Sequence, residues 1–135
     1  MSNRRTPENI KAQLKRARRA SVPFDVLLGD ETIEGTFTAL PFLQWQELIA
    51  AHPPRTDHKV DSVWGYSYAT FWPAAIRACM TDPVMDDEDW ETFEGLLSES
   101  QLARLGVQVH TLNESGPNIP KSSATSTETT SPNSG

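Results

Sequence analysis

Residues 24–39 carry the pattern that most limits what this chain can fold into. Apolar side chains alternate with others at Phe24, Val26 and Leu28, and after a turn at Gly29-Asp30-Glu31 the alternation resumes over residues 32–39. A period of two predicts a β-hairpin with one buried face. An isolated two-stranded hairpin is only marginally stable in water, so this one must lie on helices or add to another sheet.

One helix is predicted directly after the hairpin, over residues 41–51. Its large apolar side chains fall on a single helical face: Phe42, Trp45, Leu48 and Ile49. His52-Pro53-Pro54 must end this helix, because a residue that precedes proline is pushed out of the helical region. Residues 55–63 are mostly polar and are predicted to form a loop.

Three more helices are predicted after that loop. The first begins at Thr70 and stops at Asp82-Pro83, and its buried stripe consists of Phe71, Trp72, Ala75, Ile76, Cys79 and Met80. The second is short and begins in the acidic residues 86–89, where negative charge favours a helix N-terminus. Ser98 and Gln101 predict a capping box that opens the last helix. The buried stripe of that helix is Leu102, Leu105, Val109 and Leu112.

The charge of the chain is divided unevenly. Residues 1–19 hold seven basic residues against Glu8, a net charge of +6, although the whole chain has a net charge of −6. Thr6-Pro7-Glu8 predicts the start of a helix that runs to about Ala20. Its apolar stripe is thin, so this helix gains little from packing. A basic arm on an acidic body indicates an electrostatic contact, either within an assembly or with an anionic partner.

Together these patterns predict an α+β, mainly helical protein in three parts. A basic helical arm covers residues 1–21, and a domain with the hairpin and about four packed helices covers residues 22–114. Residues 115–135 are rich in Ser and Thr and are predicted to be disordered, because they offer little apolar surface to bury. The chain shows no membrane-spanning run or signal peptide, and its single cysteine, Cys79, cannot form an internal disulfide. A soluble, intracellular protein is expected.

Motifs for catalysis, metal binding and cofactor binding are missing. The soft metal ligands, His52, His58, His110 and Cys79, show no paired spacing, and residues 86–89 lack the glycine and distal glutamate of a calcium loop. The usual nucleophile and phosphate-binding motifs are missing too. We therefore expect no enzyme, cofactor or metal, although a triad dispersed along the chain stays open. Nucleic-acid binding through the arm is disfavoured, because no aromatic residue is interleaved with its cations.

The middle of the chain resembles the tail assembly chaperones of long-tailed, siphovirus-type bacteriophages, especially phages of actinobacteria. The resemblance covers residues 22–114 and is carried by the order and spacing of short segments. These are Phe37-Thr-Ala-Leu-Pro41, Trp45-Gln-Glu-Leu48, His52-Pro-Pro-Arg55, Thr70-Phe71, Pro73-Ala-Ala-Ile76, Ala78-Cys-Met80, Asp82-Pro83, the acidic residues 86–89, Ser98-Glu-Ser-Gln-Leu-Ala-Arg-Leu105 and Leu112-Asn-Glu114.

The resemblance implies a function in virion assembly. Such chaperones coat the helical tape-measure protein in the host cytoplasm before tail-tube subunits polymerise around it, and they are absent from finished virions. They self-assemble into spirals, and the tail-tube protein is a further candidate partner. A second, longer form is commonly made by ribosomal frameshifting, and Ile119-Pro120-Lys121 can be encoded by codons that contain a slippery heptamer. Two alternatives stay open: a nucleic-acid-binding regulator and a structural head–tail connector protein.

Ten residues are candidates for partner contacts. The basic arm supplies Lys11, Lys15, Arg18 and Arg19. We expect this arm to contact the acidic helix start of a neighbouring copy, at Asp86, Asp87 and Asp89. The aromatic candidates are Trp45, Trp72 and Trp90. For Trp45 the favoured interpretation is a core residue that anchors its helix, since helical apolar stripes usually face the core.

Overall fold

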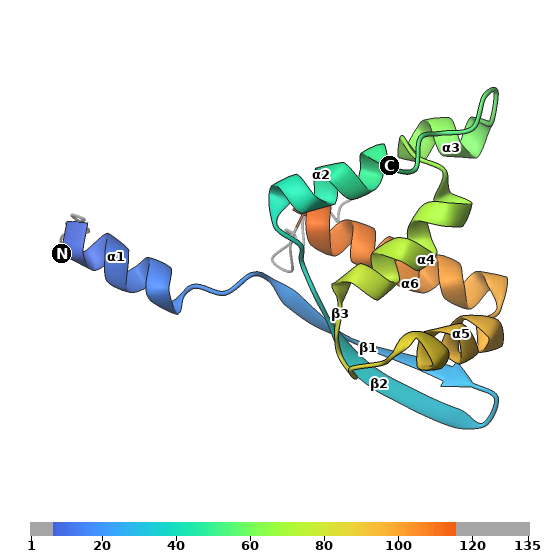
Figure 1. Ribbon diagram of the computed structural model, residues 1–135, viewed down its shortest axis with the longest axis horizontal. Coiled ribbons are helices and arrows are strands. Elements are labelled where there is room, and N and C mark those ends of the chain that lie inside the picture. Colours follow the sequence, from blue (N-terminus) through green and yellow to red (C-terminus); the bar gives the residue numbers. More distant parts are fainter. Residues whose placement is uncertain (1–6, 116–135) are drawn as a thin grey trace, which may run out of the picture.

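The computed structural model describes residues 7–115 of the chain (Figure 1). Within that range it contains six helices and one three-stranded antiparallel sheet, so the predicted α+β, mainly helical class is confirmed. The elements in chain order are α1 (Pro7–Arg16), β1 (Ser21–Leu28), β2 (Glu31–Thr38), α2 (Phe42–Ala50), α3 (Lys59–Trp64), α4 (Tyr68–Cys79), β3 (Met80–Asp82), α5 (Asp87–Leu96) and α6 (Glu99–Ser115). The segment predicted to be disordered lies outside the described residues, apart from Ser115 at the end of α6.

The predicted hairpin is present, and its apolar face is buried. β1 and β2 pair along their whole length and turn at Gly29, whose φ of 65° suits glycine. Phe24 lies opposite Gly35, and its ring stacks on Phe37 with the centroids 4.3 Å apart. A Cβ atom at Gly35 would lie 2.6 Å from Cε2 of Phe24. The missing side chain at position 35 therefore makes room for the Phe24 ring.

Helices α4 and α6 lie side by side and cover the sheet (Figure 1). The stripe predicted for the last helix is buried at Leu105, Val109 and Leu112, and the predicted stripe of α4 is buried from Phe71 to Cys79. The two helices approach closely at Gly106, where an added Cβ would lie 2.6 Å from Cδ2 of Trp72. The indole ring thus occupies the space that a side chain at position 106 would need.

The free edge of β1 is closed by α6. Three long side chains of α6 donate hydrogen bonds to alternate backbone carbonyls of β1: Gln101 to Leu27 (2.5 Å), Arg104 to Asp25 (2.7 Å) and Gln108 to Pro23 (2.8 Å). Pro23 suits this edge because proline has no N–H to leave unpaired there. Exposed strand edges invite pairing with other chains, so these contacts protect the sheet as well as fasten it to α6.

The predicted capping box at the start of α6 is confirmed. The N–H of Gln101 donates to Oγ of Ser98 (3.1 Å), and the N–H of Ser98 donates to Oε1 of Gln101 (2.9 Å). Proline also ends the helix after the hairpin as predicted, because α2 stops at Ala50, just before His52-Pro53-Pro54.

Several predicted boundaries are wrong. The expected loop over residues 55–63 contains most of α3, which His58 caps by accepting the N–H of Asp61 and which Gly65 ends at a φ of 87°. Histidine is not a usual capping residue, so this helix was hard to predict from the sequence. The basic helix ends at Arg16 instead of Ala20, because Ala20 already accepts a backbone hydrogen bond from Ala39 (2.8 Å) as the hairpin begins.

The strand β3 was not predicted, and the helix before it is displaced relative to its predicted limits. That helix, α4, runs from Tyr68 rather than Thr70 and stops at Cys79, so Met80 belongs to β3. Met80 pairs with Phe37 on the free edge of β2. A strand of three residues is too short to show a period, and only the nearby edge of β2 makes it extended.

The close approach at position 106 predicts the outcome of a glycine substitution. We expect Gly106→Ala to lower the free energy of unfolding by about 1–3 kcal/mol, because the new methyl group would displace the Trp72 ring. Gly95 in α5 is the matched control, since a Cβ there would meet no atom within 4 Å. Gly95→Ala should stabilise the protein by about 0.5–1 kcal/mol through helix propensity. Urea unfolding followed by tryptophan fluorescence measures both, and equal effects would contradict the packing argument.

Candidate partner-binding surfaces

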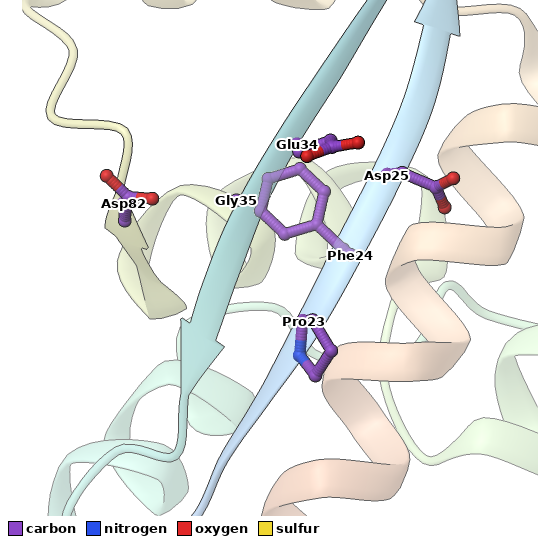
Figure 2. Close-up of a pocket in the computed structure, with 6 residues that line it drawn as sticks. All are labelled: Pro23, Phe24, Asp25, Glu34, Gly35 and Asp82. Atoms are coloured by element: carbon purple, nitrogen blue, oxygen red, sulfur yellow. The ribbon is translucent and has the colours of Figure 1, made fainter.

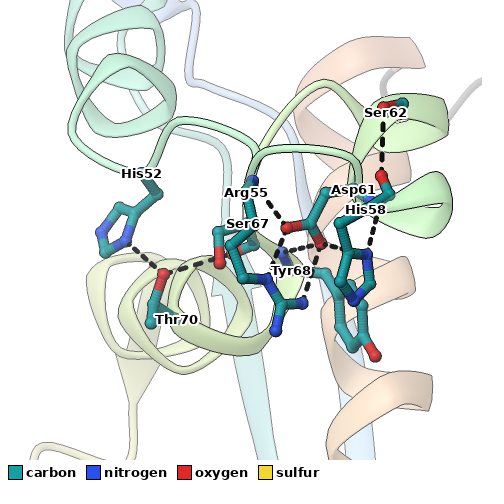
Figure 3. Close-up of polar contacts among 8 residues, drawn as sticks. All are labelled: His52, Arg55, His58, Asp61, Ser62, Ser67, Tyr68 and Thr70. Atoms are coloured by element: carbon teal, nitrogen blue, oxygen red, sulfur yellow. Dashed lines mark hydrogen bonds and ion pairs between the residues drawn. The ribbon is translucent and has the colours of Figure 1, made fainter.

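A buried carboxylate organises the segment between α2 and α4 (Figure 3). The side chain of Asp61 is fully buried and accepts hydrogen bonds from the backbone N–H (2.9 Å), Nε (2.7 Å) and Nη2 (3.0 Å) of Arg55, and a longer one from the N–H of Tyr68 (3.4 Å). The Arg55 hydrogen bonds hold the pKa of Asp61 well below its usual range. With its oxygens occupied in this way, Asp61 fixes the loop to α4 and is not placed to accept a proton from a substrate.

The histidine that follows α2 also has a structural partner. Nδ1 of His52 lies 2.9 Å from the hydroxyl of Thr70, which itself donates to the backbone carbonyl of Ser67 (3.3 Å). The N–H of Ser67 in turn donates to the carbonyl of His52 (2.9 Å). Because the Thr70 hydroxyl proton is directed to a carbonyl, this pair joins the turn to the first residues of α4 and does not resemble an activated nucleophile.

A second polar chain crosses the aromatic core. Nε1 of Trp72 donates to the hydroxyl of Tyr66 (3.2 Å), and that hydroxyl lies 2.9 Å from Nδ1 of His110 on α6. Burial raises the pKa of Tyr66 to about 12 and lowers the pKa of His110. A neutral imidazole suits this site, because its unprotonated Nδ1 can accept the tyrosine proton while the hydroxyl accepts from the indole.

The three tryptophans proposed for partner contacts are core residues. Trp45, Trp72 and Trp90 expose only 2%, 6% and 5% of their surface. The interpretation of Trp45 as an anchor fits its contacts, because it packs edge-on against Phe71 and its Nε1 donates to Oε2 of Glu114 (2.7 Å). In this fold the three rings are not surfaces for a partner, since each is needed to fill the interior.

Two of the four basic candidates make contacts within the chain. Nη1 of Arg18 donates to the carbonyls of Lys15 (3.0 Å) and Ala17 (2.9 Å) at the end of α1, and Nε of Arg19 donates to the carbonyl of Ala39 (2.8 Å). The side chains of Lys11 and Lys15 make no hydrogen bond or ion pair with the residues described. The candidate cations that could still contact a partner are therefore Lys11 and Lys15, both on α1.

The acidic candidates at the start of α5 form hydrogen bonds and an ion pair within the same chain. Asp86 and Asp89 form a capping box, in which the N–H of Asp89 donates to Oδ1 of Asp86 (2.8 Å). Asp87 pairs with Nη2 of Arg77, whose guanidinium also lies over the Trp90 ring. The structure does not bring the basic and acidic candidates together within one copy, because α1 points away from the body (Figure 1).

An apolar surface that the sequence did not identify lies on α2. Phe42 and Leu43 each expose 72% of their surface, although Phe42 was predicted to be buried with Trp45. Phe42 opens the helix, and the interior is reached only by residues from Trp45 onward. A shallow hollow of about 240 Å³, lined by neither Phe42 nor Leu43, lies between α2 with its flanking residues and Ala78 of α4. Its other lining residues are Leu40, Gln44, Glu47, Leu48 and Ala51.

Residues 7–115 contain no group of three or more His, Cys, Asp or Glu side chains placed to hold a metal ion. Among the helices described, none is long and apolar enough to cross a membrane. Comparisons of the chain with protein-family models, with curated proteins and with solved structures give no match. The surfaces of the protein are therefore the guide to its function.

The buried histidine predicts a pH dependence of stability. Because burial lowers the pKa of His110 in the folded state, the unfolded chain binds the extra proton more readily. The free energy of unfolding should be at its full value above about pH 6.5, the ordinary histidine pKa, and fall as the pH drops below it. In His110→Gln this slope should become shallower between about pH 5.5 and 7.5. Urea titrations at several pH values test this, and an unchanged slope would contradict it.

Proposed function

We propose that this protein is a non-enzymatic tail assembly chaperone of a long-tailed bacteriophage. It would bind the tape-measure protein and further copies of itself in the host cytoplasm before the tail tube polymerises. The resemblance of residues 22–114 to such chaperones is the starting point of the proposal. The apolar surface on α2 is the structural observation that supports it best.

The exposed pair on α2 suits a client with apolar helical stripes. Phe42 and Leu43 stand out from a helix that is anchored through Trp45, so their positions are fixed while their side chains stay open to solvent. Burying one such side chain contributes roughly 1.5–3 kcal/mol. Association itself has a cost of several kcal/mol, so two side chains support only weak binding by a single copy. Weak contacts repeated along an elongated client can be released when the tube subunits replace them.

The other parts of the proposal follow from the resemblance. A longer form made by frameshifting near Ile119-Pro120-Lys121 would carry a second domain beyond the residues described, and the codons of those three residues decide whether the slippery heptamer exists. The tail-tube protein is a further candidate partner. The chaperone would be missing from purified particles, whereas a head–tail connector protein would be present in them.

Substitution on α2 tests the apolar surface. In co-expression with the tape-measure protein, Phe42→Asp/Leu43→Asp should weaken co-purification roughly tenfold or more. The fold should survive, because both residues are mostly exposed and negative charge suits a helix N-terminus. Val63→Asp/Val84→Asp is the matched control, since these valines expose 83% and 91% of their surface outside α2.

Three outcomes separate the possibilities. Loss of the client with the α2 variant but not with the control supports the proposed surface. Equal recovery with both variants would exclude α2 as the contact while leaving the chaperone function. A tape-measure protein that stays equally soluble without this chain, and never co-purifies with it, would overturn the function. A gel-shift titration with duplex DNA, which should show no salt-sensitive binding, tests the nucleic-acid alternative.

A further inference from the structure

The outer face of the sheet carries an acidic hollow (Figure 2). Phe24 and Val26 of β1 face the core, so Asp25 between them faces outward, and it pairs directly across the strands with Glu34. The hollow beside them has a volume of about 550 Å³. Its lining residues are Pro23, Phe24, Asp25, Glu34, Gly35 and Asp82.

The two facing carboxylates form no ion pair within the described residues. Like charges directly opposite each other on a sheet are destabilising. Within residues 7–115 the ion pairs involve only Arg55, His58, Asp61, Arg77 and Asp87, so the carboxylates of Asp25 and Glu34 are in no ion pair there. The nearby Arg104 guanidinium donates to the backbone carbonyl of Asp25 instead. Together with Asp82 they do not converge on one point that could hold a metal ion. This surface is therefore suited to an extended cation with charges several ångströms apart.

Helix α1 has the complementary properties. It buries none of its residues, and Leu14 exposes 68% of its surface. Lys11, Leu14 and Lys15 lie at spacings of three and four, so they share one face of the helix. This face carries an apolar side chain and two ammonium groups, which complement a hollow lined by both apolar and acidic residues.

The connection between α1 and β1 directs the helix away from its own sheet. Arg19 and Ala20 are both hydrogen-bonded to Ala39, which extends the hairpin contacts back from β1. Only Ala17 and Arg18 are then left to turn the chain so that α1 could fold back onto its own sheet. The side chain of Arg18 is already hydrogen-bonded to carbonyls at the end of α1. Figure 1 accordingly shows α1 projecting from the body.

We propose that α1 of one copy docks in the acidic hollow of a second copy. Lys11 and Lys15 would pair with Asp25 and Glu34, and Leu14 would cover the apolar surface of Pro23. The inference rests on the self-association part of the proposed function, for which it names the contact. It replaces the contact expected at the start of α5. Because the arm and the hollow are different surfaces, the contact is head-to-tail, and each copy can engage two neighbours.

Charge reversal on each surface tests this contact in the full-length protein. Lys11→Glu/Lys15→Glu and Asp25→Lys/Glu34→Lys should each weaken self-association roughly tenfold or more at low salt. The chain with all four substitutions should associate again, because it restores opposite charges and keeps the net charge at −6. Glu88→Lys/Glu91→Lys on exposed positions of α5 is the control, with the same charge change as the sheet variant. Sedimentation velocity over a range of protein and salt concentrations measures association.

Each result has a defined meaning. Loss in both reversals, recovery in the fourfold variant and no effect of the control support the docking site. Loss in the α5 control would place the contact at the acidic start of α5 and overturn the inference. Oligomers that ignore both reversals, or a fourfold variant that does not recover, would also overturn it while leaving self-association intact. A wild-type chain that stays monomeric at every concentration would remove self-association itself, but the client-binding test on α2 would still stand.

Discussion

Helix α6 joins the sheet, α2 and α4 into one body, and the fold depends on its contacts with each of them. Its buried stripe packs into the core, and Gly106 lets α4 approach until the Trp72 ring rests on the helix backbone. On another side, three of its side chains fasten the edge of β1. Near its C-terminus, Asn113 accepts a hydrogen bond from the backbone N–H of Leu40 (2.8 Å), and Glu114 accepts one from the indole N–H of Trp45. A hairpin that is marginal alone thus becomes one face of a packed domain.

The parts of this fold that were predictable from sequence are those in which a local period determines burial. The alternation around Val26 and the helical stripe through Val109 both appear in the core as predicted. β3 and α3 were missed, because an existing sheet edge stabilises the first and a histidine cap begins the second. Such contacts join residues that only the folded chain brings together, and no short window of sequence contains them.

The candidate site was less predictable than the fold for a related reason. Composition identifies tryptophan as a preferred contact residue, but the same large ring is the best filler of a small core. Here the indoles fill the core. Phe42, which was expected inside, is exposed because the core contacts of α2 begin at Trp45. The directly opposed acids Asp25 and Glu34 become visible as a pair only when the register of the hairpin is known.

The exposed features of the molecule are separated in a way that suits assembly. Exposed apolar side chains lie on α2, acidic ones on the outer face of the sheet, and basic ones on α1. Figure 1 shows that these three elements lie in different parts of the molecule, so one copy could contact different molecules through different elements. A contact through α1 relies on exposed charges and one leucine, which gives a weak interface that salt can loosen. In the proposed head-to-tail row, linked copies would have a joint affinity for an elongated client far above that of any single copy. The same weakness would let such a row come apart from its end, because each terminal copy would be held by one neighbour only.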